Sequence, residues 1–204
     1  MRRPRGRRVP VNRYNNPYHA GEVADELNVS RETASWLVGQ RDGATADTES
    51  TTTSPTDIHV DWSATGRDGR RLSHAGAIMA DLLASEGEAD VTVGVGKTGA
   101  PLATVVSQER ETGLTVYVPS TSETTTRART DSFSQNFAPV ADRDCYVVDD
   151  NIDTGQTMTE TITQVRKRGG TPVGAVVLTD KLDADQIEGV AVQSLVEIVQ
   201  MGEE

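Results

Sequence analysis

CYVVDDNIDTGQT (145–157) carries the most informative pattern in this chain of 204 residues. It begins with a short, continuous apolar run, which predicts a strand buried on both faces of a parallel sheet. Two carboxylates end the run, and a loop containing Thr and Gly leads into a segment of helical periodicity. A strand, a tight loop and a helix in this order are typical of α/β domains.

The polar side chains after the apolar run match two neighbouring parts of a sugar phosphate. Asp149 and Asp150 can accept hydrogen bonds from the vicinal hydroxyls of a ribose. The loop that follows offers backbone N–H groups, hydroxyls and a helix N-terminus, which together bind phosphate. The residues expected to contribute are Asp153, Thr154, Gly155, Gln156 and Thr157, with Gly155 allowing close backbone approach. The alternative is an acidic turn without a ligand.

Strand-length and helical segments alternate over the whole C-terminal part of the chain. Val-rich runs predict strands over 91–96, 114–119, 145–150 and 172–180, and apolar spacing predicts helices over 72–85 and 156–169. The stripes of these helices are Leu72, Ala75, Met79 and Leu82, and Met158, Ile162 and Val165. We therefore expect a doubly wound α/β domain with a mainly parallel sheet, whose ligands bind at the carboxyl ends of the strands.

The N-terminal stretch 19–40 has the apolar spacing of two short helices that cross at a tight turn. Its inward positions are Val23, Ala24, Leu27, Val29, Ala34 and Leu37. This spacing predicts a small all-α helix-turn-helix segment, whose second helix enters the major groove of DNA. The expected DNA-binding residues are Ser30, Arg31, Glu32, Thr33 and Ser35. The alternative is a helical hairpin that packs on the body of the protein or dimerises.

Two further segments flank the predicted helix-turn-helix. Residues 41–56 are small and polar, and they predict a linker to a C-terminal domain over 57–204. Residues 1–18 form a basic arm suited to the DNA backbone or minor groove. Three prolines in this arm exclude the helix on which a helix-turn-helix normally rests. Either that supporting helix comes from elsewhere, for example from a partner subunit, or the arm is not native.

The net charge of the chain is distributed unevenly. The formal net charge is −11, yet the first thirteen residues hold six arginines and no acidic residue. The remainder is strongly acidic, and only three of the 20 basic residues are lysines. Such a surface stays hydrated in concentrated salt, where repulsion among like charges is screened. We expect a halophilic protein whose acidity does not exclude DNA; the alternative is an ordinary acidic protein.

The single cysteine and the shortness of the apolar runs exclude several classes of protein. Cys145 excludes an internal disulfide framework and a cysteine-based zinc cluster, and its apolar neighbours predict a core position. No segment approaches the roughly 20 apolar residues of a transmembrane helix, and no apolar signal region follows the N-terminal arginines. We expect a cytoplasmic protein with no membrane partner and no metal bound directly by its side chains.

Segment 145–157 resembles the motif that binds phosphoribosyl pyrophosphate (PRPP) in type I phosphoribosyltransferases. GVGKTGAPLA (94–103) is similar to the pyrophosphate-binding loop of the orotate enzymes, with Pro101 starting the next helix. This resemblance covers about residues 57–198. It implies ligand contacts from Gly96, Lys97, Thr98 and Gly99.

The sequence departs from that enzyme family where catalysis uses a mobile loop. Orotate phosphoribosyltransferases carry lysines and a histidine in this loop, whereas residues 120–141 contain neither Lys nor His. Arg127 and Arg129 supply charge, but arginine is a poor proton donor at neutral pH. Asn151, where the family usually has an apolar or small residue, is a milder departure. We expect ligand binding without catalysis; an active transferase acting on orotate or a purine is the alternative.

Three further stretches point to a narrower resemblance. GEVADELNVSRETASWLV (21–38), DIHVDW (57–62) and SFSQNFAPV (132–140) are similar to the GfcR-type transcriptional regulators of haloarchaea. The resemblance implies DNA-binding control of sugar-catabolism genes, with the former catalytic domain sensing an effector. We expect PRPP or another phosphorylated sugar, together with Mg²⁺, to shift a homodimer between two arrangements of its recognition helices. A binding module that does not contact DNA is a third reading.

Overall fold

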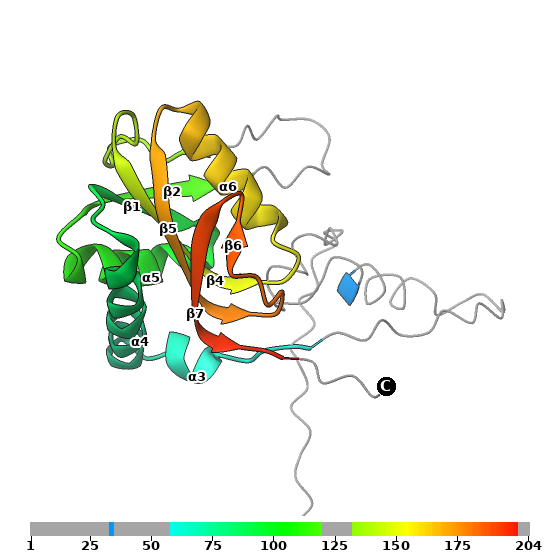
Figure 1. Ribbon diagram of the computed structural model, residues 1–204. Coiled ribbons are helices and arrows are strands. Elements are labelled where there is room, and N and C mark those ends of the chain that lie inside the picture. The colour runs from blue at the N-terminus through cyan, green and yellow to red at the C-terminus, as the bar shows by residue number, and fades with distance from the viewer. Residues whose placement is uncertain (1–32, 35–57, 120–131, 200–204) are drawn as a thin grey trace, which may run out of the picture.

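A computed structural model describes residues 33–34, 58–119 and 132–199 (Figure 1). Its helices are α3 (Ser63–Gly66), α4 (Gly69–Leu82), α5 (Gly96–Glu109) and α6 (Gln156–Lys167), with a 3₁₀ helix η1 over Leu83–Glu86. Its strands are β1 (Val91–Val95), β2 (Gly113–Val118), β3 (Ser132–Phe133), β4 (Asp144–Ile152), β5 (Thr171–Asp180), β6 (Gln186–Ile187) and β7 (Val190–Glu197). Within these ranges, no helix is both long and apolar enough to cross a membrane.

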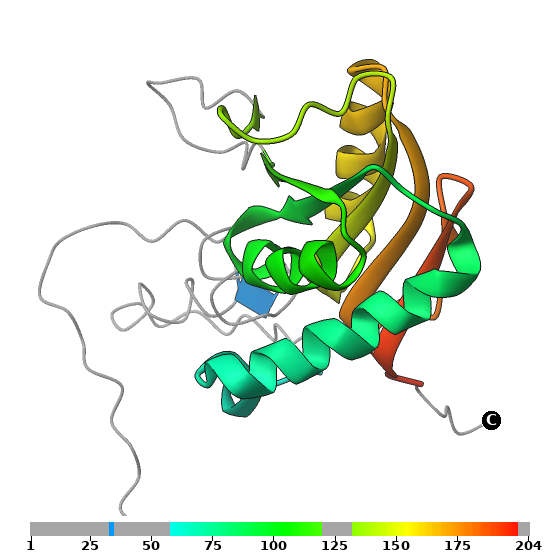
Figure 2. The ribbon, with the colours of Figure 1, turned by 90° about the vertical axis from the view of Figure 1, so that its left-hand side faces the viewer.

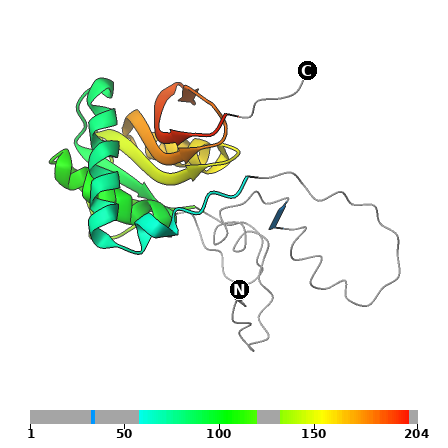
Figure 3. The same cartoon turned by 90° about the horizontal axis from the view of Figure 1, so that it is seen from below.

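All strands join one sheet of seven, in the order β3-β2-β1-β4-β5-β7-β6. Neighbours among β2, β1, β4, β5 and β7 run parallel. The two-residue strands β3 and β6 pair antiparallel at the edges. Figures 2 and 3 show α4 and α5 together against one face of the sheet and α6 against the other. The doubly wound, mainly parallel architecture that the sequence predicts is confirmed.

The ends of several elements differ from the prediction. Helix α4 begins before residue 72 because the Asp68 carboxylate accepts hydrogen bonds from the backbone N–H groups of Arg70 and Arg71. The prediction that Pro101 starts α5 is wrong, since that helix begins at Gly96 and contains Pro101. An exposed proline in the second turn removes one N–H from the helix but does not prevent its first turn. The apolar pattern does not predict strand β7, because its residues are mostly half-buried and include polar ones.

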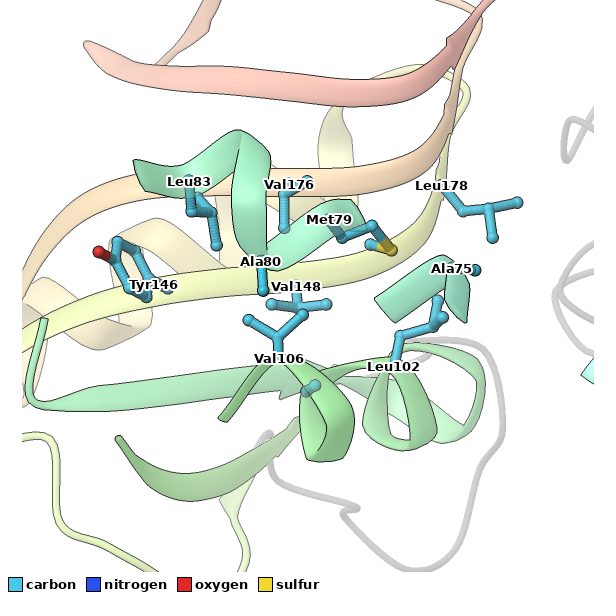
Figure 4. Packing of buried hydrophobic residues seen from close by; sticks show 11 residues of the cluster. Ala75, Met79, Ala80, Leu83, Leu102, Val106, Tyr146, Val148, Val176 and Leu178 are labelled. Carbon is cyan, nitrogen blue, oxygen red and sulfur yellow. The ribbon is translucent and has the colours of Figure 1, made fainter. Parts of the chain in front are cut away.

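The main core lies between the sheet and the pair α4 and α5. Figure 4 shows Met79 of α4, Leu102 and Val106 of α5, and Val148 of β4 among its buried side chains. On the other face, the predicted α6 stripe of Met158, Ile162 and Val165 is buried. Both helical faces therefore pack against the sheet as the apolar spacing predicts.

Most of the predicted N-terminal organisation lies outside the described residues. Thr33 and Ala34 are helical, and Ala34 is buried. The basic arm 1–18, the rest of 19–40 and the linker 41–56 lie outside, as do Ser30, Arg31, Glu32 and Ser35. The helix-turn-helix and its DNA contacts therefore remain predictions.

Cys145 lies in β4 with no exposed surface, which confirms its predicted core position. Burial, with smaller contributions from the charges of Asp144 and Asp90, raises the pKa of its thiol to about 12. We predict that Ellman's reagent modifies no cysteine in the native protein at pH 8 and one per chain after unfolding. Because the thiol ionises more easily in the unfolded chain, the free energy of unfolding should also fall as the pH rises toward 12. Fast modification of the native protein would contradict this placement.

Candidate functional site

The direction in which the chain winds reverses between β1 and β4. Strand β2 follows β1 on one side of this pair, and β5 follows β4 on the other. In open α/β sheets, ligands bind at such a switch point, outside the carboxyl ends of the strands. Here α5 begins directly after β1, and residues 153–155 lead from β4 into α6. The two sequence motifs therefore flank the same point of the sheet.

Asp150 connects these motifs through its carboxylate, and both of its oxygens accept hydrogen bonds. The Thr98 hydroxyl donates to one oxygen over 2.7 Å, and the Trp62 indole N–H donates to the other over 3.2 Å. Only 7% of Asp150 is exposed. Strand β4 continues to Ile152, so Asp149 and Asp150 lie within the strand. The predicted strand 145–150, which ends at Asp150, is therefore two residues too short at this end. The structure thus brings Thr98 and Asp150 into direct contact.

Asp149 lies against the first turn of α5. Its Oδ1 accepts a hydrogen bond from the backbone N–H of Asp150 over 2.8 Å. A Cβ added at Gly99 would lie 2.7 Å from the carbonyl oxygen of Val148 and 3.1 Å from Oδ1 of Asp149. Gly99 is therefore required for the close approach of α5 to β4, which is a packing role in addition to its predicted place in a ligand loop.

We predict that Gly99→Ala lowers the free energy of unfolding by about 1–3 kcal/mol, because the added methyl group meets backbone atoms that cannot easily move. Gly69→Ala is the matched control, since a Cβ there meets nothing within 4 Å in the first turn of α4. Urea denaturation of both variants measures the difference. Equal stability of the two variants would contradict the role assigned to Gly99.

The loop after β4 and the start of α6 present backbone N–H groups that have no acceptor among the described residues. Gly155 has a φ of 73°, a left-handed conformation that favours glycine, and it directly precedes α6. No side chain caps this helix, and in the described part of the chain the backbone N–H groups of residues 154–157 donate to no other residue. Thr154, Gln156 and Thr157 are exposed. An anion at this position would meet several N–H groups and the positive end of the helix dipole.

Lys181 and Lys97, the lysines that follow β5 and β1, differ in their exposure to solvent. The Nζ of Lys181, just after β5, lies 3.6 Å from Oδ1 of Asp153, and the side chain of Lys181 is only 7% exposed. Lys97, in the first turn of α5, is exposed. Asp153 is thus engaged in an ion pair, whereas Lys97 is exposed in the first turn of the helix that begins at the switch point.

Acidic residues follow β5 and end β7. A hydrogen bond with Asp183 raises the pKa of Glu197, and the charges of Asp183 and Asp180 raise it further. In the ranges that the structure covers, no three His, Cys, Asp or Glu side chains are arranged to hold a metal ion. In proteins, Mg²⁺ is commonly bound by one or two carboxylates together with the phosphate oxygens of a ligand.

Trp62 and Thr179 contact the Asp150–Asn151 segment, although the sequence pattern assigns neither of them a role in ligand binding. Trp62 reaches Asp150, and the Thr179 hydroxyl donates to Oδ1 of Asn151 over 2.8 Å. Asn151, the departure from the enzyme motif, is thereby connected to β5. In the sequence, Trp62 stands out only as the last residue of DIHVDW (57–62), one of the stretches that resemble the regulators, and that stretch does not identify a partner for the indole.

Comparison with known proteins gives consistent results at the levels of family and fold. A family model described as "Phosphoribosyl transferase domain" matches residues 61–188. The transcriptional regulator GfcR of Halorubrum lacusprofundi is 53% identical over 189 residues, covering 90% of each chain. GfcR of Haloarcula marismortui is 52% identical over 186 residues, covering 89% of this chain and 88% of that protein.

The fold is shared with solved enzymes at much lower identity. The crystal structure of orotate phosphoribosyltransferase from Aeropyrum pernix superposes with a TM-score of 0.59 at 20% identity, over 79% of this chain and 92% of that one. At this identity the likeness shows the fold alone, whereas the regulators match nearly the whole chain. The resemblance stated from the residues is confirmed: this chain belongs to the phosphoribosyltransferase-domain family and, within it, to the transcriptional regulators named GfcR.

Proposed function

We propose that this chain is a DNA-binding regulator of sugar-catabolism genes that senses PRPP, or a closely related sugar phosphate, through its phosphoribosyltransferase-like domain. The predicted helix-turn-helix over 19–40 binds the promoter as part of a homodimer in the cytoplasm, where the promoter lies. The acidic composition fits a salt-rich cytoplasm, in agreement with the haloarchaeal sources of the relatives.

One observation supports the ligand above all others. A buried carboxylate pair, the first turn of α5 and the uncapped start of α6 meet at the switch point of the sheet. The carboxylates suit the ribose hydroxyls. Lys97 and the N–H groups of residues 154–157, which donate to none of the described residues, suit phosphate groups. PRPP carries both kinds of group, and Mg²⁺ bound to its phosphates offsets their repulsion from Asp149 and Asp150.

Titration calorimetry on the full chain tests the ligand. We expect PRPP with Mg²⁺ to bind more tightly than either ribose 5-phosphate or pyrophosphate, because each of these occupies only one half of the site. Absence of binding by all three would overturn the sensor role.

Retention of promoter DNA tests the second partner. We expect the full chain to retain its own promoter fragment in preference to a shuffled fragment, and PRPP to change that affinity. For a twofold dimer, the protected half-sites should lie about one helical turn apart. If the chain shows no preference between the two fragments, with or without PRPP, the proposal that it is a DNA-binding regulator is overturned.

An active phosphoribosyltransferase is the second candidate, since the binding motif is present. Residues 120–141 contain no lysine or histidine to act on the pyrophosphate, which favours binding without turnover. We expect no pyrophosphate release when PRPP is mixed with orotate, adenine or guanine. Steady release that requires one of these bases would favour the enzyme.

A further inference from the structure

The indole of Trp62 lies where the proposed ligand has to bind. Its N–H donates to Oδ2 of Asp150 over 3.2 Å, and its ring packs at the margin of the core between α4, α5 and the sheet. The ring also covers Gly66, where an added Cβ would lie 2.5 Å from a ring carbon. Trp62 is therefore held by one polar contact to the site and by apolar contacts beside it.

A ribose hydroxyl and an indole N–H are both donors, and Asp150 is the acceptor for which they compete. With 7% of its surface exposed, Asp150 has little room for a further donor while its present partners stay in place. A ligand that uses this carboxylate must therefore move one of them.

Thr98 and Trp62, the two described residues whose side chains donate to the Asp150 carboxylate, are not held equally. Thr98 belongs to α5, whose first turn is fixed against β4 by the contact of Gly99, and its hydrogen bond measures 2.7 Å. Trp62 immediately precedes α3, a four-residue helix without a buried residue, and its hydrogen bond is longer. Of these two described donors, Trp62 is the one that can leave at lower cost.

We infer that Trp62 is an internal occupant of the ribose subsite, and that a PRPP-type ligand displaces its indole N–H from Asp150. This inference rests on the proposed ligand. Because Trp62 follows closely after the predicted linker 41–56, its displacement starts a change at the junction between the sensing domain and the predicted DNA-binding segment.

Fluorescence and calorimetry on the full chain test this inference together. The chain has two tryptophans, so Trp36→Phe leaves Trp62 as the single reporter and serves as the parent. On titration with PRPP and Mg²⁺, we expect the Trp62 emission to shift to longer wavelength and acrylamide quenching to increase. Both changes should saturate at the ligand concentration that saturates the calorimetric signal.

Adding Trp62→Phe to that parent removes the N–H but keeps an aromatic ring. We expect the double variant to bind PRPP about five- to tenfold more tightly than the parent, because no hydrogen bond to a charged group has to be broken. Thermal unfolding and circular dichroism establish that the double variant is folded.

The outcomes separate the two proposals. If the parent binds no PRPP, the proposed sensor role fails and this inference fails with it. If the parent binds PRPP while Trp62 emission and quenching stay unchanged and the double variant shows no gain in affinity, only the displacement of Trp62 is overturned. A weaker affinity of the double variant, with emission unchanged, would also overturn displacement and make Trp62 a direct ligand contact.

Discussion

Replacing Asp150 with Asn is expected to weaken PRPP binding by on the order of a hundredfold. The carboxylate can accept a charge-assisted hydrogen bond from a ribose hydroxyl at the oxygen that Trp62 leaves, whereas the amide offers that hydroxyl a neutral acceptor or an opposing donor. The same change also opposes an amide N–H to the hydroxyl of Thr98 or the indole N–H of Trp62. Titration calorimetry with PRPP and Mg²⁺ measures the loss.

Asp142→Asn is the matched control for this substitution. Asp142 is exposed, lies before the start of β4 at the opposite end of that strand, and has a φ of 56° that Asn tolerates well. The substitution Asp142→Asn removes the same charge at a position away from the site. PRPP affinity should therefore stay within about twofold, because screening weakens the effect of a distant charge. Similar losses in both variants would show that net charge, and not the ribose contact, controls binding. Thermal unfolding verifies that Asp150→Asn remains folded.

Replacing Leu102 with Ala is expected to lower the free energy of unfolding by about 3 kcal/mol. Leu102 has no exposed surface and lies between α5, α4 and the sheet, close to Ala75 and Met79 in Figure 4. The substitution removes apolar contacts and leaves a cavity that close-packed neighbours fill only in part. Urea denaturation, analysed as a two-state transition, gives the change.

Leu182→Ala provides the same chemical change at a position that is 42% exposed. Its expected cost is below about 1 kcal/mol, since little apolar area returns to water. Comparable losses at both positions would mean that the cluster around Leu102 does not stabilise the described domain more than its surface does.

The succession of the principal strands and helices along the chain was predictable, because each of them has its own local periodicity. Continuous valine-rich runs occur where a parallel strand is covered on both faces, and β1 is buried over its full length. The helical stripe from Met158 to Val165 matches the buried face of α6 for the same kind of reason. The half-buried strand β7 has no such continuous run, so the sequence pattern does not predict it.

The candidate site was predictable in its motifs but not in its contacts. Gly155 and the residues around it form a strand–loop–helix unit that is short enough to be recognised along the chain. The hydrogen bond from Thr98 to Asp150 joins residues 52 positions apart, and the one from Trp62 spans 88 positions. No pattern within either segment specifies its partner in the other.

By itself, the sequence determined the class of the domain, the positions of its principal strands and the chemistry available at their ends, because apolar period, glycine and charge act over a few neighbouring residues. Only the tertiary structure decided that α5 packs on β4 through Gly99, that Asp149 and Asp150 are buried within the strand, and that Trp62 occupies the second oxygen of Asp150. These features depend on the strand order and on the close packing of a helix against a sheet, which arise when distant segments bury their apolar faces together.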